Sequence, residues 1–169
     1  MQLNQEMETL SEKLSEMATA AEAFCGLISE HETPRDGWLE ELYALLPRLH
    51  SAVTALKSHN VNDLPVTEID LDERFNLYSR LRKQLGERDS YWLEFDASPE
   101  QVNMSGSLAD DLTDIYFDLL HGLQLLDEAW PQRAAEVWQM TYRMHWGQHL
   151  VDAERHLYAL KVRNQLRAS

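Results

Sequence analysis

Apolar residues recur in steps of three and four along most of this chain, which is the spacing of one face of an α-helix. The first series alternates steps of four and three and comprises Leu3, Met7, Leu10, Leu14, Met17, Ala21, Phe24 and Ile28. Most positions between them are Gln, Glu, Lys or Ser. Such a stripe is typical of a coiled-coil seam and needs a partner helix, either within the chain or in a second copy.

A second helical stripe follows a start signal. Thr33 is suited to cap a helix whose first residue is Pro34. The Asp36 side chain, in the first turn, can accept a hydrogen bond from the backbone of the capping residue. The stripe consists of Trp38, Leu42, Leu45, Leu49, Ala52 and Leu56. Pro47 lies inside it and is expected to kink or split the helix, because proline removes a backbone hydrogen bond.

The middle of the chain combines turn signals with one further helical stripe. Residues 58–69 are mostly polar and contain Pro65, which predicts a connector. A third helix is expected over residues 70–85, with Gly86 as its stop. Its expected inward residues are Leu71, Phe75, Tyr78, Leu81 and Leu85. The aromatic run at 91–95 indicates an extended segment or a small strand, and residues 96–106 are loop-like.

Two helical patterns complete the chain. Ser107 is the expected N-cap of a fourth helix, whose stripe is Leu108, Leu112, Ile115, Leu119 and Leu126. A fifth pattern starts at Pro131 and continues to about residue 165, with Gly147 as the expected site of a bend. These patterns predict an all-α, up-and-down helical bundle of five or six helices with no significant sheet. We expect a single helical domain over 1–169, made of N-terminal helices (1–57), the connector (58–69) and a core (70–169).

Charge and cysteine content narrow the choice of partners and compartment. The net charge of −14 opposes binding to nucleic acid and to anionic membrane surfaces, so we expect neither as a partner. Cys25, the single cysteine, lies in the first helical stretch and is expected to be a small buried hydrophobe in a reducing compartment. The first residues lack the basic and apolar regions of a secretory signal, and a cytoplasmic location is expected.

The residues capable of metal chemistry lie in two polar segments of the last two helical patterns. Helical spacing places several carboxylates of residues 107–118 along one side, and the histidines of residues 145–149 along another. Successive helices joined by a short turn are usually antiparallel neighbours, so the two segments are expected to face each other. Carboxylate and imidazole suit Zn, Mn or Fe, so the candidate metal ligands are Asp111, Asp114, Asp118, His145, His149 and Asp152.

A structural interpretation of the same residues competes with the metal site. Carboxylates in the first turns of a helix are stabilised by the helix dipole without any ligand. His145 and His149 can donate hydrogen bonds to those aspartates and so tie two helices together, which would raise the pKa of the histidine involved. In this interpretation Trp146 and Gly147 form a packing pair, the glycine permitting close helix approach.

No motif indicates a known catalytic chemistry. The sequence lacks a Gly-x-Ser-x-Gly elbow, a phosphate loop and a dinucleotide fingerprint. We therefore expect a cytoplasmic helical interaction or regulatory module rather than an enzyme, with a protein partner or a homodimer through the first helix. The alternative is a divalent-metal-binding bundle.

The segments SLADDLTDIYFDLLHGL (107–123) and MHWGQHLVDAERHLYAL (144–160) resemble a bacterial all-helical family that is catalogued only as a domain of unknown function. That family carries a Ser-Leu-x-Asp-Asp-Leu-x-Asp-Ile block and a later His-Trp-Gly-x-His block, and the specific likeness covers residues 91–160. The resemblance implies an all-helical fold in which the two blocks belong together. It implies no activity.

A weaker likeness is to the all-α nucleotide pyrophosphohydrolases of the MazG type. Asp111-Leu-Thr-Asp114 is similar to their Glu-x-x-Asp magnesium motif. The partner motif Glu-x-x-Glu is absent from the sequence, and the nearest substitute, Asp70-Leu-Asp-Glu73, is more simply a helix cap. This likeness implies Mg-dependent hydrolysis of nucleoside triphosphates as the enzymatic alternative.

Overall fold

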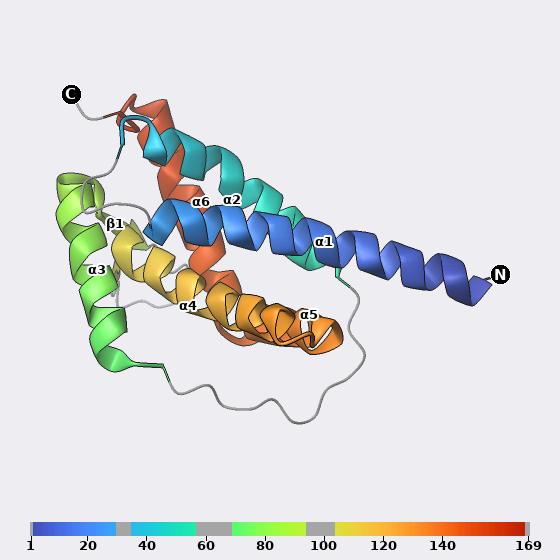
Figure 1. The fold of residues 1–169 in the computed structure, drawn as a ribbon. Helices are drawn as coiled ribbons and strands as arrows, with labels where there is room; N and C mark the ends of the chain where they lie inside the picture. The colour runs from blue at the N-terminus through green and yellow to red at the C-terminus, as the bar shows by residue number, and fades with distance from the viewer. Residues whose placement is uncertain (1, 30–34, 57–68, 94–103, 168–169) are drawn as a thin grey trace, which may run out of the picture.

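The computed structural model describes residues 2–29, 35–56, 69–93 and 104–167, and Figure 1 shows their arrangement. The side chains of residues 2–7, 9, 10 and 104 are outside this description. The expected helix start at Thr33 and Pro34, most of the connector, and Phe95 also lie outside the described residues.

Helices α1 (Gln2–Ser29) and α2 (Trp38–Ala55) pack against each other and run in opposite directions (Figure 1). α2 begins at Trp38, whose side chain is buried, and Gly37 precedes it with a φ of 84°. Pro47 lies inside α2, and the helix continues through it, so the expected split does not occur. The second half of α1 supplies a buried face that includes Cys25, as the sequence predicts.

The inward face of helix α3 (Leu71–Leu85) differs from the predicted one. Asp70 caps it by accepting hydrogen bonds from the backbone N–H groups of residues 72 and 73. Leu71 and Phe75 were expected inside but are 76% and 64% exposed. Only the C-terminal half of α3 packs on the core, through Leu77, Leu81 and Leu85. Periodicity identified the helix and correctly placed Tyr78, Leu81 and Leu85 on the core side, but it wrongly extended the inward face to Leu71 and Phe75.

A two-stranded antiparallel sheet and a short 3-10 turn (Gly86–Arg88) join α3 to the next helix. Its strands are β1 (Ser90–Leu93) and β2 (Met104–Ser107), with Tyr91 opposite Gly106. A Cβ on Gly106 would lie 2.2 Å from the Tyr91 ring, so only glycine leaves room for that ring. The sequence prediction of a small strand is confirmed for residues 91–93, and the prediction of a loop is wrong for residues 104–106.

Helix α4 (Leu108–Asp127) is the most widely shared element of the fold, with contacts to α1, α3, α5 and α6. Ser107 is its N-cap, as predicted, and its hydroxyl accepts a hydrogen bond from the backbone N–H of Asp110. The apolar stripe of α4 is buried at Leu108, Leu112, Ile115 and Leu119. α4 therefore places its carboxylates at a junction of several helices.

The fifth predicted helix is divided into α5 (Pro131–Thr141), a π-helical turn (Tyr142–Trp146) and α6 (Gly147–Val162). The backbone N–H of Gly147 donates to the carbonyl of Tyr142, five residues earlier. A Cβ on Gly147 would lie 2.3 Å from that carbonyl oxygen. Gly147 is thus required by the widened turn, which corrects its predicted role in close helix approach.

The described residues form an all-α fold apart from the small sheet, which confirms the predicted class. Their core joins buried side chains of every long helix, among them Phe24, Leu46, Leu112, Trp138 and Trp146. In the described part of the chain, no helix is long and apolar enough to cross a membrane.

Replacing Gly122 by Ala is expected to destabilise the fold by about 1–3 kcal/mol, because a Cβ there would lie 2.1 Å from the indole Nε1 of buried Trp138. That indole also donates to the Leu119 carbonyl (3.1 Å), which limits its movement. Gly26→Ala in α1 is the control, since its Cβ would meet no atom within 4 Å. The control should gain about 0.5–1 kcal/mol in urea unfolding. Equal stability changes in the two variants would contradict this packing argument.

Candidate functional site

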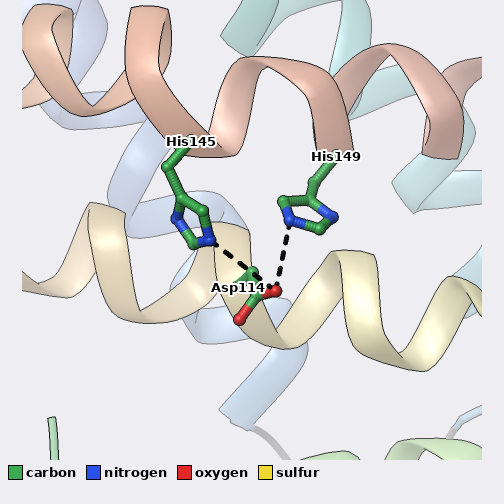
Figure 2. Close-up of side chains that lie close together, drawn as sticks. All are labelled: Asp114, His145 and His149. Atoms are coloured by element: carbon green, nitrogen blue, oxygen red, sulfur yellow. Dashed lines mark ion pairs between the residues drawn. The ribbon is translucent and has the colours of Figure 1, made fainter.

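Asp114, His145 and His149 each direct a potential ligand atom toward a common point (Figure 2). Asp114 belongs to the second turn of α4, His145 to the π turn and His149 to the first turn of α6. Oδ2 of Asp114 lies 3.2 Å from Nε2 of His149 and 3.9 Å from Nε2 of His145. The three ligand atoms all lie within 4.8 Å of one another, a convergence that the described residues show once.

Each imidazole ring also contacts a second carboxylate of α4 through its other nitrogen, Nδ1. Nδ1 of His149 lies 2.8 Å from Oδ1 of Asp111, and Nδ1 of His145 lies 2.6 Å from Oδ2 of Asp118. An ionised carboxylate only accepts hydrogen bonds, so each Nδ1 carries the proton and donates it. The neutral form of each ring therefore leaves Nε2 without a proton, and its lone pair faces Asp114.

With a neutral His149, this arrangement brings two hydrogen-bond acceptors, Nε2 of His149 and Oδ2 of Asp114, close together. Their repulsion is relieved only when a proton or a metal ion lies between them. Neutral His149 presents the Nε2 lone pair to Oδ2 of Asp114, and these two atoms are 3.2 Å apart. A second proton on His149 would convert the contact into a charge-assisted hydrogen bond. A metal ion bound to both atoms would remove the repulsion in another way. The cluster is therefore built for a positive charge, supplied by a proton or by a metal.

Arg74 of α3 neutralises the far side of Asp114. Its Nε and Nη2 atoms donate to Oδ1 of Asp114 at 3.0 and 2.5 Å, and Nη2 also donates to Oδ1 of Asp110 at 3.0 Å. The guanidinium thus occupies the carboxylate oxygen that the histidines do not face. Asp114 is 10% exposed and lies between Arg74 and the two rings.

The small sheet supports the site through Tyr91. The Tyr91 hydroxyl donates to Oδ2 of Asp111 over 2.5 Å, while Oδ1 of the same carboxylate accepts from His149. The ring of His156 stacks on Tyr91 with centroids 4.7 Å apart, and Nε2 of His156 donates to the Arg88 carbonyl (2.7 Å). A chain of contacts therefore extends from β1 through Asp111 to His149.

The pKa shift of His149 favours a positive charge on that ring, whereas the shifts of the neighbouring carboxylates reflect their burial. The pKa of His149 is raised, mainly because Asp111 accepts its Nδ1–H, although burial acts in the opposite direction. Burial raises the pKa of Asp111 and of Asp118, and it outweighs the hydrogen bonds from their histidine partners.

The structure brings together most of the residues that the sequence singled out. The predicted contact between the histidines and the aspartates is confirmed at Asp111, Asp114 and Asp118. Asp152 does not join the converging ligand atoms in the described structure, and its Oδ2 accepts from Gln148 instead. Tyr142, in the π turn with His145, donates its hydroxyl hydrogen to Nε2 of His50 in α2 over 2.9 Å.

Arg74 and Tyr91 are the two site residues that the sequence analysis missed. They lie 40 and 20 residues from their aspartate partners, and no helical spacing connects them to α4. The only sequence signal was the aromatic run at 91–95, which indicated a packed extended segment without indicating its partner.

Tyr91→Phe is expected to destabilise the protein by about 1.5–3 kcal/mol, because a buried carboxylate would lose a hydroxyl donor while the ring packing is kept. Tyr158→Phe, at a tyrosine that is 60% exposed, is the control and should stay within about 0.5 kcal/mol of the parent protein. Urea unfolding at neutral pH measures both. A Tyr91→Phe protein as stable as the control would show that the hydroxyl contributes nothing to the cluster.

Comparison with known proteins extends these observations. A family model described as "Domain of unknown function (DUF5063)" matches residues 8–163. Among solved structures, the chain is similar to protein BF1032 from Bacteroides fragilis, with a TM-score of 0.67 and 24% sequence identity. That match covers 88% of this chain and 92% of the other, and it shows a shared fold. No curated protein matches the chain in sequence.

Proposed function

Since the chain belongs to the DUF5063 family, a family with no assigned activity, we propose from the site itself that this protein binds a divalent transition metal. The ligand atoms would be Oδ2 of Asp114 and the Nε2 atoms of His145 and His149. The observation that carries this proposal is the pair of carboxylates behind the two rings. Metal-binding histidines almost always donate their second N–H to a carboxylate, carbonyl or water, and Asp111 and Asp118 accept those hydrogens here.

The spacing of the donors supports a small four-coordinate ion. Bonds of about 2.1 Å to a tetrahedral ion place neighbouring ligand atoms about 3.4 Å apart. Oδ2 of Asp114 lies 3.2 and 3.9 Å from the two Nε2 atoms, so small side-chain movements suffice. Three protein ligands also leave a position for water or a substrate, and the His145 side chain is 48% exposed.

The donor set favours zinc or iron over magnesium. Mg²⁺ prefers oxygen ligands, whereas two of the three donors here are imidazole nitrogens. The segment Asp70-Leu-Asp-Glu73, the nearest substitute for the Glu-x-x-Glu motif of MazG-type enzymes, forms the start of α3, with Asp70 as its N-cap. Mg-dependent hydrolysis of nucleoside triphosphates is thus the less supported form of the metal proposal. A nucleotide panel assayed with Mg²⁺ tests it, and we expect no turnover.

Elemental analysis of protein purified without an affinity tag tests the metal proposal directly. We expect close to one equivalent of transition metal per chain, or uptake of one equivalent of Zn²⁺ by protein stripped with a chelator. His145→Ala and His149→Ala should each lose the ion. His121→Ala is the control, because His121 lies on α4 outside the converging group. Absence of stoichiometric uptake by the parent protein would refute the proposal.

A cytoplasmic interaction module that dimerises through α1 is the second candidate. The N-terminal part of α1 extends beyond the other helices (Figure 1), and the apolar seam of the sequence continues into it. Leu14, which packs at the edge of the core, is the described residue of that seam nearest the free end. We expect a concentration-dependent dimer that Leu14→Glu weakens and that Ser11→Glu, at an exposed neighbour, leaves intact. A monomer at every concentration would contradict this candidate.

A further inference from the structure

The outer carboxylates of α4 are committed to protein partners. Asp111 accepts hydrogen bonds on both of its oxygens, from His149 and from Tyr91. Oδ2 of Asp118 accepts from His145 over 2.6 Å. These contacts orient the imidazole rings, so a metal ion that displaced either carboxylate from its histidine would lose that orientation.

Arg74 forms ion pairs with the two remaining carboxylates of this face, Asp110 and Asp114. It holds Oδ1 of Asp114 through two N–H groups and Oδ1 of Asp110 through Nη2. Asp110 is 45% exposed, and its Oδ1 is held by the Arg74 guanidinium rather than by a histidine. One carboxylate oxygen, Oδ2 of Asp114, is then left facing both Nε2 atoms.

We propose, on the basis of the metal site proposed above, that Arg74 determines which metals that site accepts. By holding Asp114 to a single coordinating oxygen and keeping Asp110 out of reach, Arg74 limits the protein to two nitrogen ligands and one oxygen ligand. Zn²⁺ and Co²⁺ bind well in four-coordinate sites of this kind. Ca²⁺ needs six to eight oxygens, often from bidentate carboxylates, and Mg²⁺ needs octahedral oxygen ligands. Mn²⁺ shares the preference of these ions for carboxylate and water oxygens.

Arginine is suited to this role because its planar fork donates to two acceptors at once. Lysine keeps the charge but offers a single point donor, so Arg74→Lys should leave Oδ1 of Asp114 or Asp110 free to turn toward the ion. Arg74→Gln frees both oxygens and also removes a positive charge. The charge effect raises the affinity for every divalent cation, whereas the release of oxygens raises it selectively for Mn²⁺ and Ca²⁺.

The experiment compares the Zn²⁺ and Mn²⁺ dissociation constants of parent protein, Arg74→Lys and Arg74→Gln, measured by competition with a chromophoric chelator. Almost any nitrogen and oxygen site binds Zn²⁺ more tightly than Mn²⁺, so the change in the ratio is the decisive quantity. We expect both variants to reduce the preference for Zn²⁺ by about tenfold or more, the size of effect that a lost outer contact has on metal sites. Arg82→Gln, at an exposed arginine on the same helix, is the charge control and should keep the parent ratio.

The possible outcomes separate this inference from the metal proposal beneath it. A parent protein that binds no metal refutes the site itself. A parent protein that binds Zn²⁺, with both Arg74 variants keeping its metal preference within about twofold, overturns the role of Arg74 and leaves the site standing. If neither variant folds, the visible spectrum of the Co²⁺-loaded parent protein decides. The intense absorption of four-coordinate Co²⁺ supports the inference, and the weak absorption of six-coordinate Co²⁺ overturns it.

Discussion

Asp114→Asn is expected to abolish high-affinity metal binding, with a loss of more than about 100-fold in Zn²⁺ affinity. Asp114 offers the oxygen that both Nε2 atoms face, and the amide oxygen of asparagine carries no charge. The substitution keeps the size of the side chain and an acceptor for Arg74, so the fold should persist. Equilibrium dialysis against Zn²⁺, with circular dichroism to verify the fold, measures the effect.

Two matched variants give this prediction its specificity. Asp118→Asn removes a carboxylate that only orients His145, so we expect a smaller loss of about 10- to 100-fold. Asp152→Asn removes the same charge from α6 at a residue outside the converging group, and should leave Zn²⁺ affinity unchanged. Equal losses in all three variants would mean that general negative charge, rather than a defined site, attracts the ion.

Without metal, the contribution of His149 to stability is expected to be present below the ordinary histidine pKa of about 6.5 and to disappear as the pH rises above it. The folded-state pKa of His149 is raised above the unfolded value of 6.5, mainly by its hydrogen bond to Asp111. Its contribution is therefore fully present below the unfolded pKa and is lost as the pH rises through the folded pKa. A bound metal reverses the trend, because it competes with protons for Nε2 and binds neutral imidazole better at higher pH. At a free Zn²⁺ concentration about 1,000 times the Kd, the ion should stabilise the fold by about 4 kcal/mol.

Urea unfolding at several pH values, with excess Zn²⁺ or with a chelator, tests this reversal. The comparison requires His149→Gln, because burial lowers the pKa of His121 and His156, which therefore act in the opposite direction. The difference between parent and variant isolates His149. If Zn²⁺ leaves the pH profile unchanged while the chelator-treated parent shows the expected loss, a protonated, hydrogen-bonded seam is the correct description of the cluster.

The sequence identified the local features of the fold because they depend on neighbouring residues. The caps at Asp70 and Ser107, the buried stripe of α4 and the burial of Cys25 all follow from side chains within a few turns. The contact between α4 and the last helical segment was predictable, because a short connection joins α4 to the helix that starts at Pro131 and both segments carry complementary polar residues. That the chain is one domain remains a prediction, since the described ranges do not include the connector.

The tertiary structure alone decided how the site is completed. Arg74 and Tyr91 reach Asp114 and Asp111 from elements far along the chain, and helical periodicity holds no information on such contacts. The π turn before Gly147 is also a cooperative result, because its widened hydrogen bonding requires room for the Tyr142 carbonyl. A sequence pattern assigns each side chain to a face of its own helix. Which faces meet, and which oxygen of a carboxylate stays available, depends on packing between elements that are distant in the chain.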